Sequence, residues 1–136
     1  MDELFLEVVT PEKVVVSKNV DIVVAPGSLG EFGVLPDHVP FLTGLVPGEL
    51  RYTSGDKKES LAVATGFAEV SDNRVSVLVN AAEKAQDIDV ERARQAIERA
   101  RERLAQDRES EDVDFLRAEA ALKRALIRVK LAEGAQ

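Results

Sequence analysis

The hydrophobic pattern of this 136-residue chain changes its period near Ala81. Before that point apolar residues alternate over short runs, as in Leu4, Leu6 and Val8, and a period of two is typical of strands. After that point they recur at spacings of three and four, which is typical of helices. Because one kind of element cannot carry both periods, we predict a β-rich unit over residues 1–84 and a helical unit over residues 85–136.

The first unit is expected to contain about eight to ten short strands. Apolar runs at residues 4–9, 14–16 and 20–25 predict the first three. Two hairpins are predicted over residues 50–65 and 67–79, because each range has polar turn residues at its centre. Short strands at this spacing indicate a β-sandwich or a small barrel.

The second unit is expected to be an antiparallel hairpin of two helices. Apolar residues recur at helical spacing over residues 90–104 and again over residues 115–132, and the polar segment 106–112 between them predicts a turn. Asp87 or Asp89 can cap the first helix. Many residues of the two apolar stripes are alanine, which buries little surface. We therefore expect the helices to be weakly held and their arrangement to depend on a partner.

The composition excludes several classes of function. The chain has no cysteine, which rules out disulfides, thiolate metal sites and cysteine nucleophiles. His38 is the single histidine and has no nucleophile near it in the sequence, so we expect a structural or interface role and neither a catalytic nor a metal site. The net charge of −7 argues against general nucleic-acid binding. No pairing of carboxylates or of base and nucleophile suggests an enzyme.

The apolar runs are too short for a membrane span. They fall far below the roughly 18 residues expected of a spanning helix, and no basic-then-apolar leader precedes the first predicted strand. From these residues alone we expect a soluble, cytosolic chain.

Each predicted helix carries three arginines at spacings of seven and four. Every one of them directly precedes an apolar stripe residue, so the two rows flank the interface between the helices; they are Arg92, Arg99 and Arg103, then Arg117, Arg124 and Arg128. Forked guanidinium groups are suited to phosphate or carboxylate. Acidic neighbours three or four positions away favour an ordinary solvated face, and the acidic linker 109–114 is another possible partner for the arginines within the chain. Spacing leaves both interpretations open.

Four segments together resemble the epsilon subunit of the bacterial F-type ATP synthase. They are residues 30–40 (GEFGVLPDHVP), 66–70 (GFAEV), 81–89 (AAEKAQDID) and 121–125 (ALKRA). The resemblance implies an N-terminal β-sandwich followed by a C-terminal antiparallel two-helix hairpin. It also implies a non-catalytic subunit of the rotating central stalk, peripheral at the cytoplasmic face of the bacterial plasma membrane.

The resemblance implies different partners for the two units. The sandwich would contact the gamma subunit and the ring of c subunits. Glu31, on a glycine-flanked loop tip, matches the position that meets the polar loops of the ring, and His38 falls in the gamma-facing segment. The hairpin can fold against the sandwich or extend along gamma toward the catalytic alpha and beta subunits, where it opposes ATP hydrolysis. A weak alanine-rich interface gives a physical reason for two arrangements of similar free energy.

Some bacterial members bind ATP on the folded hairpin, so we expect this chain to require no cofactor but to be a candidate for ATP as a regulatory ligand. Their pattern is Ile or Leu, Asp, two free positions, Arg and Ala, which Ile88, Asp89, Arg92 and Ala93 match. The other residues that match the nucleotide site of such members are Glu83, Arg99, Arg124 and Arg128. The alternative function is a stand-alone ATP-binding sensor.

Overall fold

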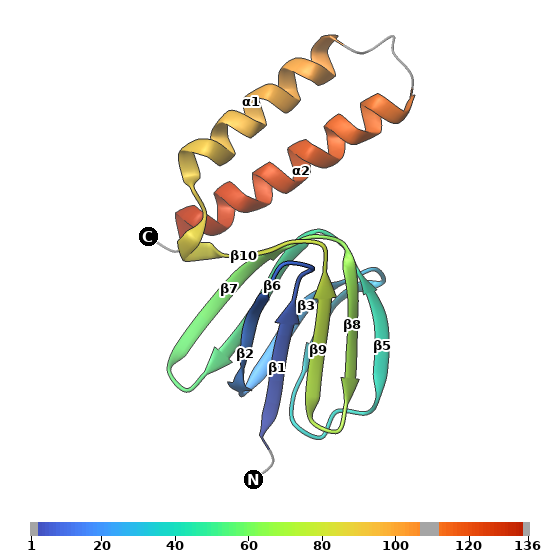
Figure 1. The fold of residues 1–136 in the computed structure, drawn as a ribbon, viewed down its shortest axis with the longest axis vertical. Coiled ribbons are helices and arrows are strands. Elements are labelled where there is room, and N and C mark those ends of the chain that lie inside the picture. Colours follow the sequence, from blue (N-terminus) through green and yellow to red (C-terminus); the bar gives the residue numbers. More distant parts are fainter. Residues whose placement is uncertain (1–2, 107–111, 135–136) are drawn as a thin grey trace. The chain divides into compact units, whose positions relative to one another are not determined.

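The computed structural model describes residues 3–106 and 112–134, and the chain divides into two compact units. One unit extends to Lys84 and the other begins at Ala85. Figure 1 shows strands in the first unit and helices in the second.

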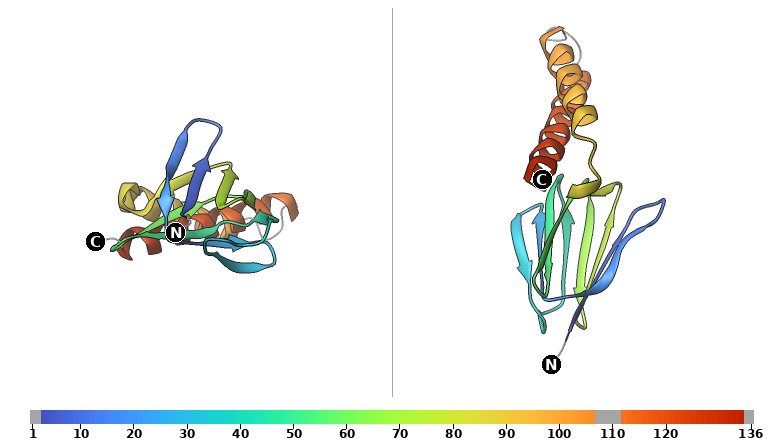
Figure 2. Two further views of the ribbon diagram at one scale, coloured as in Figure 1. Left: turned by 90° about the horizontal axis from the view of Figure 1, so that it is seen from below. Right: turned by 90° about the vertical axis from the view of Figure 1, so that its left-hand side faces the viewer.

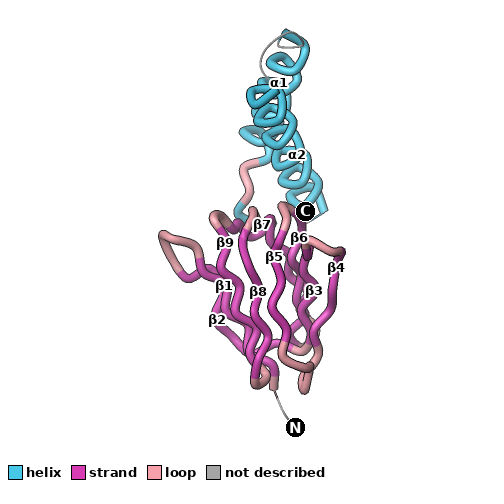
Figure 3. The backbone as a smooth tube through the Cα atoms, turned by 90° about the vertical axis from the view of Figure 1, so that its right-hand side faces the viewer, coloured by secondary structure: helices cyan, strands magenta, loops and turns pink. Residues whose placement is uncertain are grey.

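The described part of the first unit contains ten strands. They are β1 (Leu4–Val9), β2 (Val14–Val20), β3 (Ile22–Gly27), β4 (Gly30–Val34), β5 (Phe41–Leu45), β6 (Gly48–Ser54), β7 (Lys57–Val63), β8 (Gly66–Ser71), β9 (Arg74–Val79) and β10 (Ala82–Lys84). Their order is β10-β7-β6-β3-β5-β8-β9-β1-β2, with β4 paired to β3. Strands β1 and β9 run parallel, and every other pair is antiparallel. The sheet, drawn in magenta in Figure 3, closes into the predicted β-sandwich.

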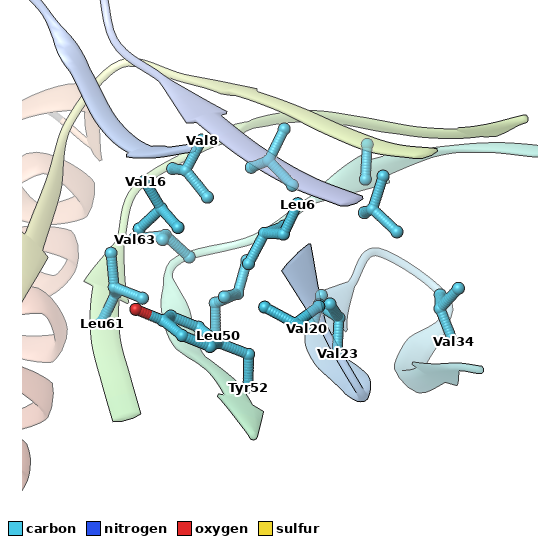
Figure 4. Close-up of a cluster of buried hydrophobic side chains, with 14 of the residues drawn as sticks. Leu6, Val8, Val16, Val20, Val23, Val34, Leu50, Tyr52, Leu61 and Val63 are labelled. Carbon is cyan, nitrogen blue, oxygen red and sulfur yellow. The ribbon is translucent and has the colours of Figure 1, made fainter. Parts of the chain in front are cut away.

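Leucine and valine fill the space inside the sandwich. Along β1, every second residue is fully buried, and these are Leu4, Leu6 and Val8. Figure 4 shows Leu6 and Val8 of β1 on one side of the core and Leu50 of β6 and Leu61 of β7 on the other. A buried leucine or valine contributes about 1.5–3 kcal/mol relative to an exposed one. Burial of aliphatic side chains therefore stabilises the strands. The period of two in the sequence arises because every second residue of a strand points into this core.

The predicted strand over residues 20–25 is wrong at its start. Val20 ends β2, and β3 begins at Ile22. Between them, the backbone N–H of Asp21 donates to the carbonyl of Thr53, and its carboxylate accepts from the N–H of Gly55 at 2.8 Å. The break is therefore caused by contacts with the β6–β7 hairpin, which lies more than thirty residues along the chain.

Both predicted hairpins are confirmed. The turn between β6 and β7 contains Gly55 at φ 62°, and the turn between β8 and β9 contains Asp72 at φ 52° and Asn73 at φ 59°. Two consecutive residues with positive φ define a type I′ turn, whose twist matches that of the flanking strands. Asp and Asn tolerate this conformation better than other non-glycine residues do.

The second unit consists of a short 3-10 helix η1 (Ala85–Asp87) and the helices α1 (Val90–Gln106) and α2 (Asp112–Gly134). The two long helices run side by side in opposite directions in Figure 1 and Figure 2. Asp89 caps α1, because its Oδ1 accepts from the backbone N–H of Arg92 at 3.1 Å. Most of the predicted turn over residues 106–112 lies outside the described residues. The expected pair of packed helices is confirmed.

Alanine dominates the interface between these helices. The buried residues are Ala93, Ile97 and Ala100 on α1, with Ala118, Ala125, Leu131 and Ala132 on α2. Three other stripe residues, Leu104, Leu122 and Val129, are half-buried, and the side chain of Phe115 lies outside the described residues. Since alanine loses little apolar surface on burial, this interface contributes far less per residue than the core of the sandwich.

Candidate functional site

The segment of residues 35–42, between β4 and the first residues of β5, exposes apolar side chains. Leu35 is 57% exposed, and Val39 and Leu42 are each 70% exposed. His38 lies half-buried among them, with its Nδ1 at 2.7 Å from the carbonyl oxygen of Val39. Its ring lies edge-on to Phe41, with centroids 6.2 Å apart. The predicted site residue His38 is thus part of a mainly apolar surface.

Asn73, which was not among the predicted site residues, holds this segment at Asp37. Asp37 has a left-handed backbone, with φ 68°, and its N–H donates to Oδ1 of Asn73 at 2.5 Å. In return, Nδ2 of Asn73 lies 3.4 Å from Oδ1 of Asp37. The two residues are 36 positions apart, so no spacing rule could have paired them.

The outer face of β8 and β9 exposes two further large apolar side chains. Phe67 on β8 is 63% exposed and Leu78 on β9 is 57% exposed. Beside them lies a hollow of about 480 Å³, lined by the β1–β2 turn at Pro11 and by residues of β8 and β9. Its lining carries no charged group, so this surface suits an apolar partner.

Glu31 lies on β4 rather than at a loop tip, so its predicted placement was wrong. The tip of the β3–β4 hairpin is formed by the two preceding turn residues, of which Leu29 is 98% exposed. The carboxylate of Glu31 accepts two hydrogen bonds from the guanidinium of Arg51, at 2.9 and 3.0 Å. Glu49 binds the same guanidinium at 3.1 Å.

This ion cluster changes the ionisation of its members. The hydrogen bonds from Arg51 lower the pKa of Glu31, and the bonds to Glu31 and Glu49 raise the pKa of Arg51. Glu31 therefore presents a carboxylate that is already paired. Arg51 was not selected from the sequence, because its partner on β4 lies 20 residues away.

Several of the residues predicted to bind a nucleotide already have structural contacts. Ile88 and Ala93 are buried in the helical unit, and Asp89 caps α1. Glu83 lies on β10 in the first unit, where it pairs with Ala62 of β7. These contacts account for the residue types at 88, 89 and 93 without a ligand.

The predicted arginines fall on one side of the hairpin. Each precedes an interface residue by one position, and because the helices are antiparallel, the same rotation on both helices brings the two rows to the same side. Arg94 contacts Glu133 at 2.7 Å and so sets the start of α1 level with the end of α2. At a rise of about 1.5 Å per residue, Arg99 then lies near the level of Arg128.

Most of these arginines are open to solvent. Arg92, Arg99 and Arg124 are exposed, and Arg128 is half-buried. Several guanidinium groups on one side of a helix pair form a surface that suits an anion with more than one charge.

Two further observations concern metal binding and membrane spanning. Within residues 3–106 and 112–134, no group of three or more His, Asp or Glu side chains could hold a metal ion. No helix in that part of the chain is long and apolar enough to cross a membrane.

Comparison with known proteins defines the class first. Residues 3–85 match the family described as "ATP synthase, Delta/Epsilon chain, beta-sandwich domain", and residues 86–133 match "ATP synthase, Delta/Epsilon chain, long alpha-helix domain". Both matches define a non-catalytic subunit of an ATP synthase. The chain belongs to the family of ATP synthase delta/epsilon chains.

Individual relatives agree with this assignment. The chain is 56% identical over 128 residues to the ATP synthase epsilon chain of Nitratidesulfovibrio vulgaris (strain DP4), covering 94% of both chains. It is 53% identical over 132 residues to that of Syntrophobacter fumaroxidans, covering 97% of both. A chain in the cryo-electron microscopy structure of the Euglena gracilis mitochondrial ATP synthase, OSCP/F1/c-ring, superposes with a TM-score of 0.79 at 25% identity, covering 98% of this chain and 82% of that chain. The resemblance to epsilon subunits is confirmed.

Proposed function

We propose that this chain is a central-stalk subunit of a proton-translocating bacterial F-type ATP synthase, which couples the c ring to gamma and restrains ATP hydrolysis through its helices. It would lie at the cytoplasmic face of the plasma membrane as a peripheral part of the complex. The observation that carries the proposal is that one well-packed sandwich has two separate surfaces of different chemistry. One is the apolar segment 35–42, and the other is the β3–β4 hairpin with Leu29 and Glu31.

Gamma is the proposed partner of segment 35–42. Four large apolar side chains exposed within eight residues are costly to leave in water, and contiguous exposed apolar surface commonly marks an interface. His38 lies within this surface, at the position that the family resemblance assigns to gamma. Covering these side chains with gamma would contribute about 25 cal/mol per Å² of apolar surface removed from water.

The c ring is the proposed partner of the β3–β4 hairpin. Leu29 is almost fully exposed at its tip, and the paired carboxylate of Glu31 follows it on β4. Because Arg51 pairs with Glu31, the carboxylate is partly compensated, and this surface suits polar loops.

A reciprocal pair of substitutions tests both assignments. Val39→Asp should abolish co-purification with gamma and leave binding to the reconstituted c ring intact. Leu29→Asp should abolish binding to the c ring and leave co-purification with gamma intact. Both residues are largely exposed, so neither change should unfold the protein. A chain whose Val39→Asp variant still co-purifies with gamma would contradict the gamma assignment.

Inhibition of ATP hydrolysis is proposed for the helical unit. Its alanine interface stabilises the closed pair of helices only weakly, so a second arrangement within a few kcal/mol is physically reasonable. Deleting residues from 86 onward should leave assembly intact and raise ATP hydrolysis by the complex. Unchanged hydrolysis after this deletion would show that the helices do not inhibit.

ATP is proposed as a regulatory ligand of the helical unit, with Glu83, Ile88, Asp89, Arg92, Ala93, Arg99, Arg124 and Arg128 at its site. The placement of the arginine rows on one side supports this. Titration of the full chain with MgATP should show binding that Arg92→Ala and Arg124→Ala weaken, whereas Arg101→Ala, outside the rows and paired with Glu98, should not. Absence of binding at millimolar ATP would remove the ligand and leave the stalk role untouched. Binding of ATP by a chain that never associates with gamma would instead favour the stand-alone sensor.

A further inference from the structure

The turn between β8 and β9 is fixed to the sheet at its second central residue. The carbonyl of Asn73 accepts from the backbone N–H of Phe5, at the start of β1, at 2.8 Å. The next residue, Arg74, contacts Glu7 of β1 at 3.2 Å and lies over the ring of Phe5, 5.0 Å from its centroid. Backbone and side-chain contacts thus hold this turn against β1.

From this fixed position, the side chain of Asn73 reaches segment 35–42. Its amide oxygen accepts from the N–H of Asp37, and its amide nitrogen lies within hydrogen-bond distance of the Asp37 carboxylate. Asp37 has φ 68°, a conformation that costs free energy for a residue with a side chain and persists where surrounding contacts favour it. The contacts with Asn73 supply that compensation.

Both ends of segment 35–42 are attached to the sheet: Leu35 directly follows β4, and Phe41 and Leu42 pair with Val70 and Glu69 of β8. The ring of Phe41 also lies edge-on to that of Phe32, with centroids 5.3 Å apart. Between these ends, the side chains of Leu35 and Val39 are largely exposed, so packing contributes little to the position of the middle of the segment. Within the segment, the N–H of His38 donates to the carbonyl of Leu35 at 3.2 Å, which closes a turn but does not attach it to the sheet. The attachment at Asp37 lies directly before His38 and Val39.

We propose that Asn73 is a positioning residue that holds segment 35–42 in the conformation that binds gamma. This inference rests on the proposed contact with gamma. Ordering a loop before binding removes an entropic cost from association, so the effect should appear in affinity and in the association rate rather than in the fold.

The chain offers a variant that removes the side chain and spares the turn. At φ 59°, glycine is at least as favourable as asparagine in a type I′ turn, so Asn73→Gly should not destabilise the β8–β9 hairpin. Asp72→Gly is the matched control, because it relieves the same backbone conformation one residue earlier and leaves the contacts with Asp37 in place.

A second variant can restore the contact in reverse. Combining Asp37→Asn with Asn73→Asp exchanges the two side chains, keeps the net charge, and retains residue types that tolerate a left-handed backbone. The backbone N–H at position 37 still meets an acceptor oxygen, and the second hydrogen bond runs in the opposite direction.

Two measurements on the full chain decide the question. One is the hydrogen exchange rate of the Asp37 amide, which needs no partner, and the other is binding to the purified cognate gamma subunit by surface plasmon resonance. Asn73→Gly should speed exchange at Asp37, leave the melting temperature unchanged or slightly higher, and weaken gamma binding about five- to tenfold. Asp72→Gly and the exchanged pair should bind like the wild type.

The outcomes are distinguishable. Unchanged gamma binding by Asn73→Gly would overturn the inference, as would a loss of binding that follows a fall in melting temperature. If the wild-type chain does not bind gamma, the proposed function fails and so does this role in docking. Amide exchange would still show whether Asn73 holds the segment.

Discussion

Each of the two units of this chain is stabilised internally by a different amount of buried apolar surface. In the sandwich, the fully buried side chains are mostly leucine and valine, drawn from strands far apart in sequence. In the helical unit, most buried residues are alanine. Because aliphatic burial scales with the area removed from water, the first unit has a deep free-energy minimum and the second a shallow one. A rigid unit suits permanent docking, whereas a weakly closed unit suits regulation.

The largest expected effect is on the core of the sandwich. Leu61→Ala removes a fully buried side chain and should lower the free energy of unfolding of this unit by about 2–5 kcal/mol. The chain has one tyrosine, Tyr52, and no tryptophan, so tyrosine fluorescence in a urea titration reports on the sandwich alone. Far-ultraviolet circular dichroism follows the helices in the same titration. A single shared transition for both signals would contradict the separation of the two units.

The next effect concerns the ionisable group in that core. The hydroxyl of Tyr52 donates to Glu59, and Tyr52→Phe should cost about 1.5–3 kcal/mol at neutral pH, since it leaves a half-buried carboxylate without this donor.

The same contact predicts a dependence on alkaline pH. Burial, and then the hydrogen bond to Glu59, raise the pKa of Tyr52 above its ordinary value of 10.0. The folded state therefore keeps a proton that the unfolded state releases, so stability is complete below about pH 10 and declines as pH rises further. Tyr52→Phe should lose less stability than the wild type between pH 9 and about pH 11. Equal losses in both proteins, measured by urea titration at each pH, would contradict this.

How much could be predicted from the sequence follows from the range of the interactions. The two units, the hairpins and the helices were predicted because periodicity and turn chemistry are local. The start of β3 was misplaced, because Asp21 is captured by a hairpin more than thirty residues away.

The candidate site residues also divide into those with local signals in the sequence and those that depend on distant contacts. His38 and the arginine rows could be selected from short segments of the sequence. The sequence offered Asp87 or Asp89 as the helix cap, and the hydrogen bond from the N–H of Arg92 identifies Asp89. Arg51 and Asn73 could not be selected, since each acts on a residue of another strand or loop. A single sequence contains no local signal for such pairs.

A moderate effect is expected at the start of α1. Asp89→Ala removes the cap on the N–H of Arg92 and should lower the stability of the helical unit by about 1 kcal/mol. Asp89→Asn keeps a capping oxygen and should have little effect. Thermal melts followed by far-ultraviolet circular dichroism would measure both variants. Equal melts for Ala and Asn would mean that the cap contributes nothing to the stability of the helical unit.

The smallest effect is expected from the contact between Arg94 and Glu133, which joins the beginning of α1 to the end of α2 at 2.7 Å. Both side chains are about half exposed, so solvent screens the pair, and a double-mutant cycle with alanine should give a coupling of about 0.2–1 kcal/mol that falls with added salt. The pair Glu98 and Arg101, 3.7 Å apart within α1, is the control.

The two pairs differ in what they can hold closed. Only the first links one helix to the other, so adding salt should promote separation of the helices in the wild type and not in the Arg94→Ala variant. In a unit whose interface is mostly alanine, even this small free energy is a sizeable share of what keeps the helices together. A coupling near zero at low salt would leave the alanine interface as the main restraint on the hairpin, and would make the contrast with the sandwich sharper still.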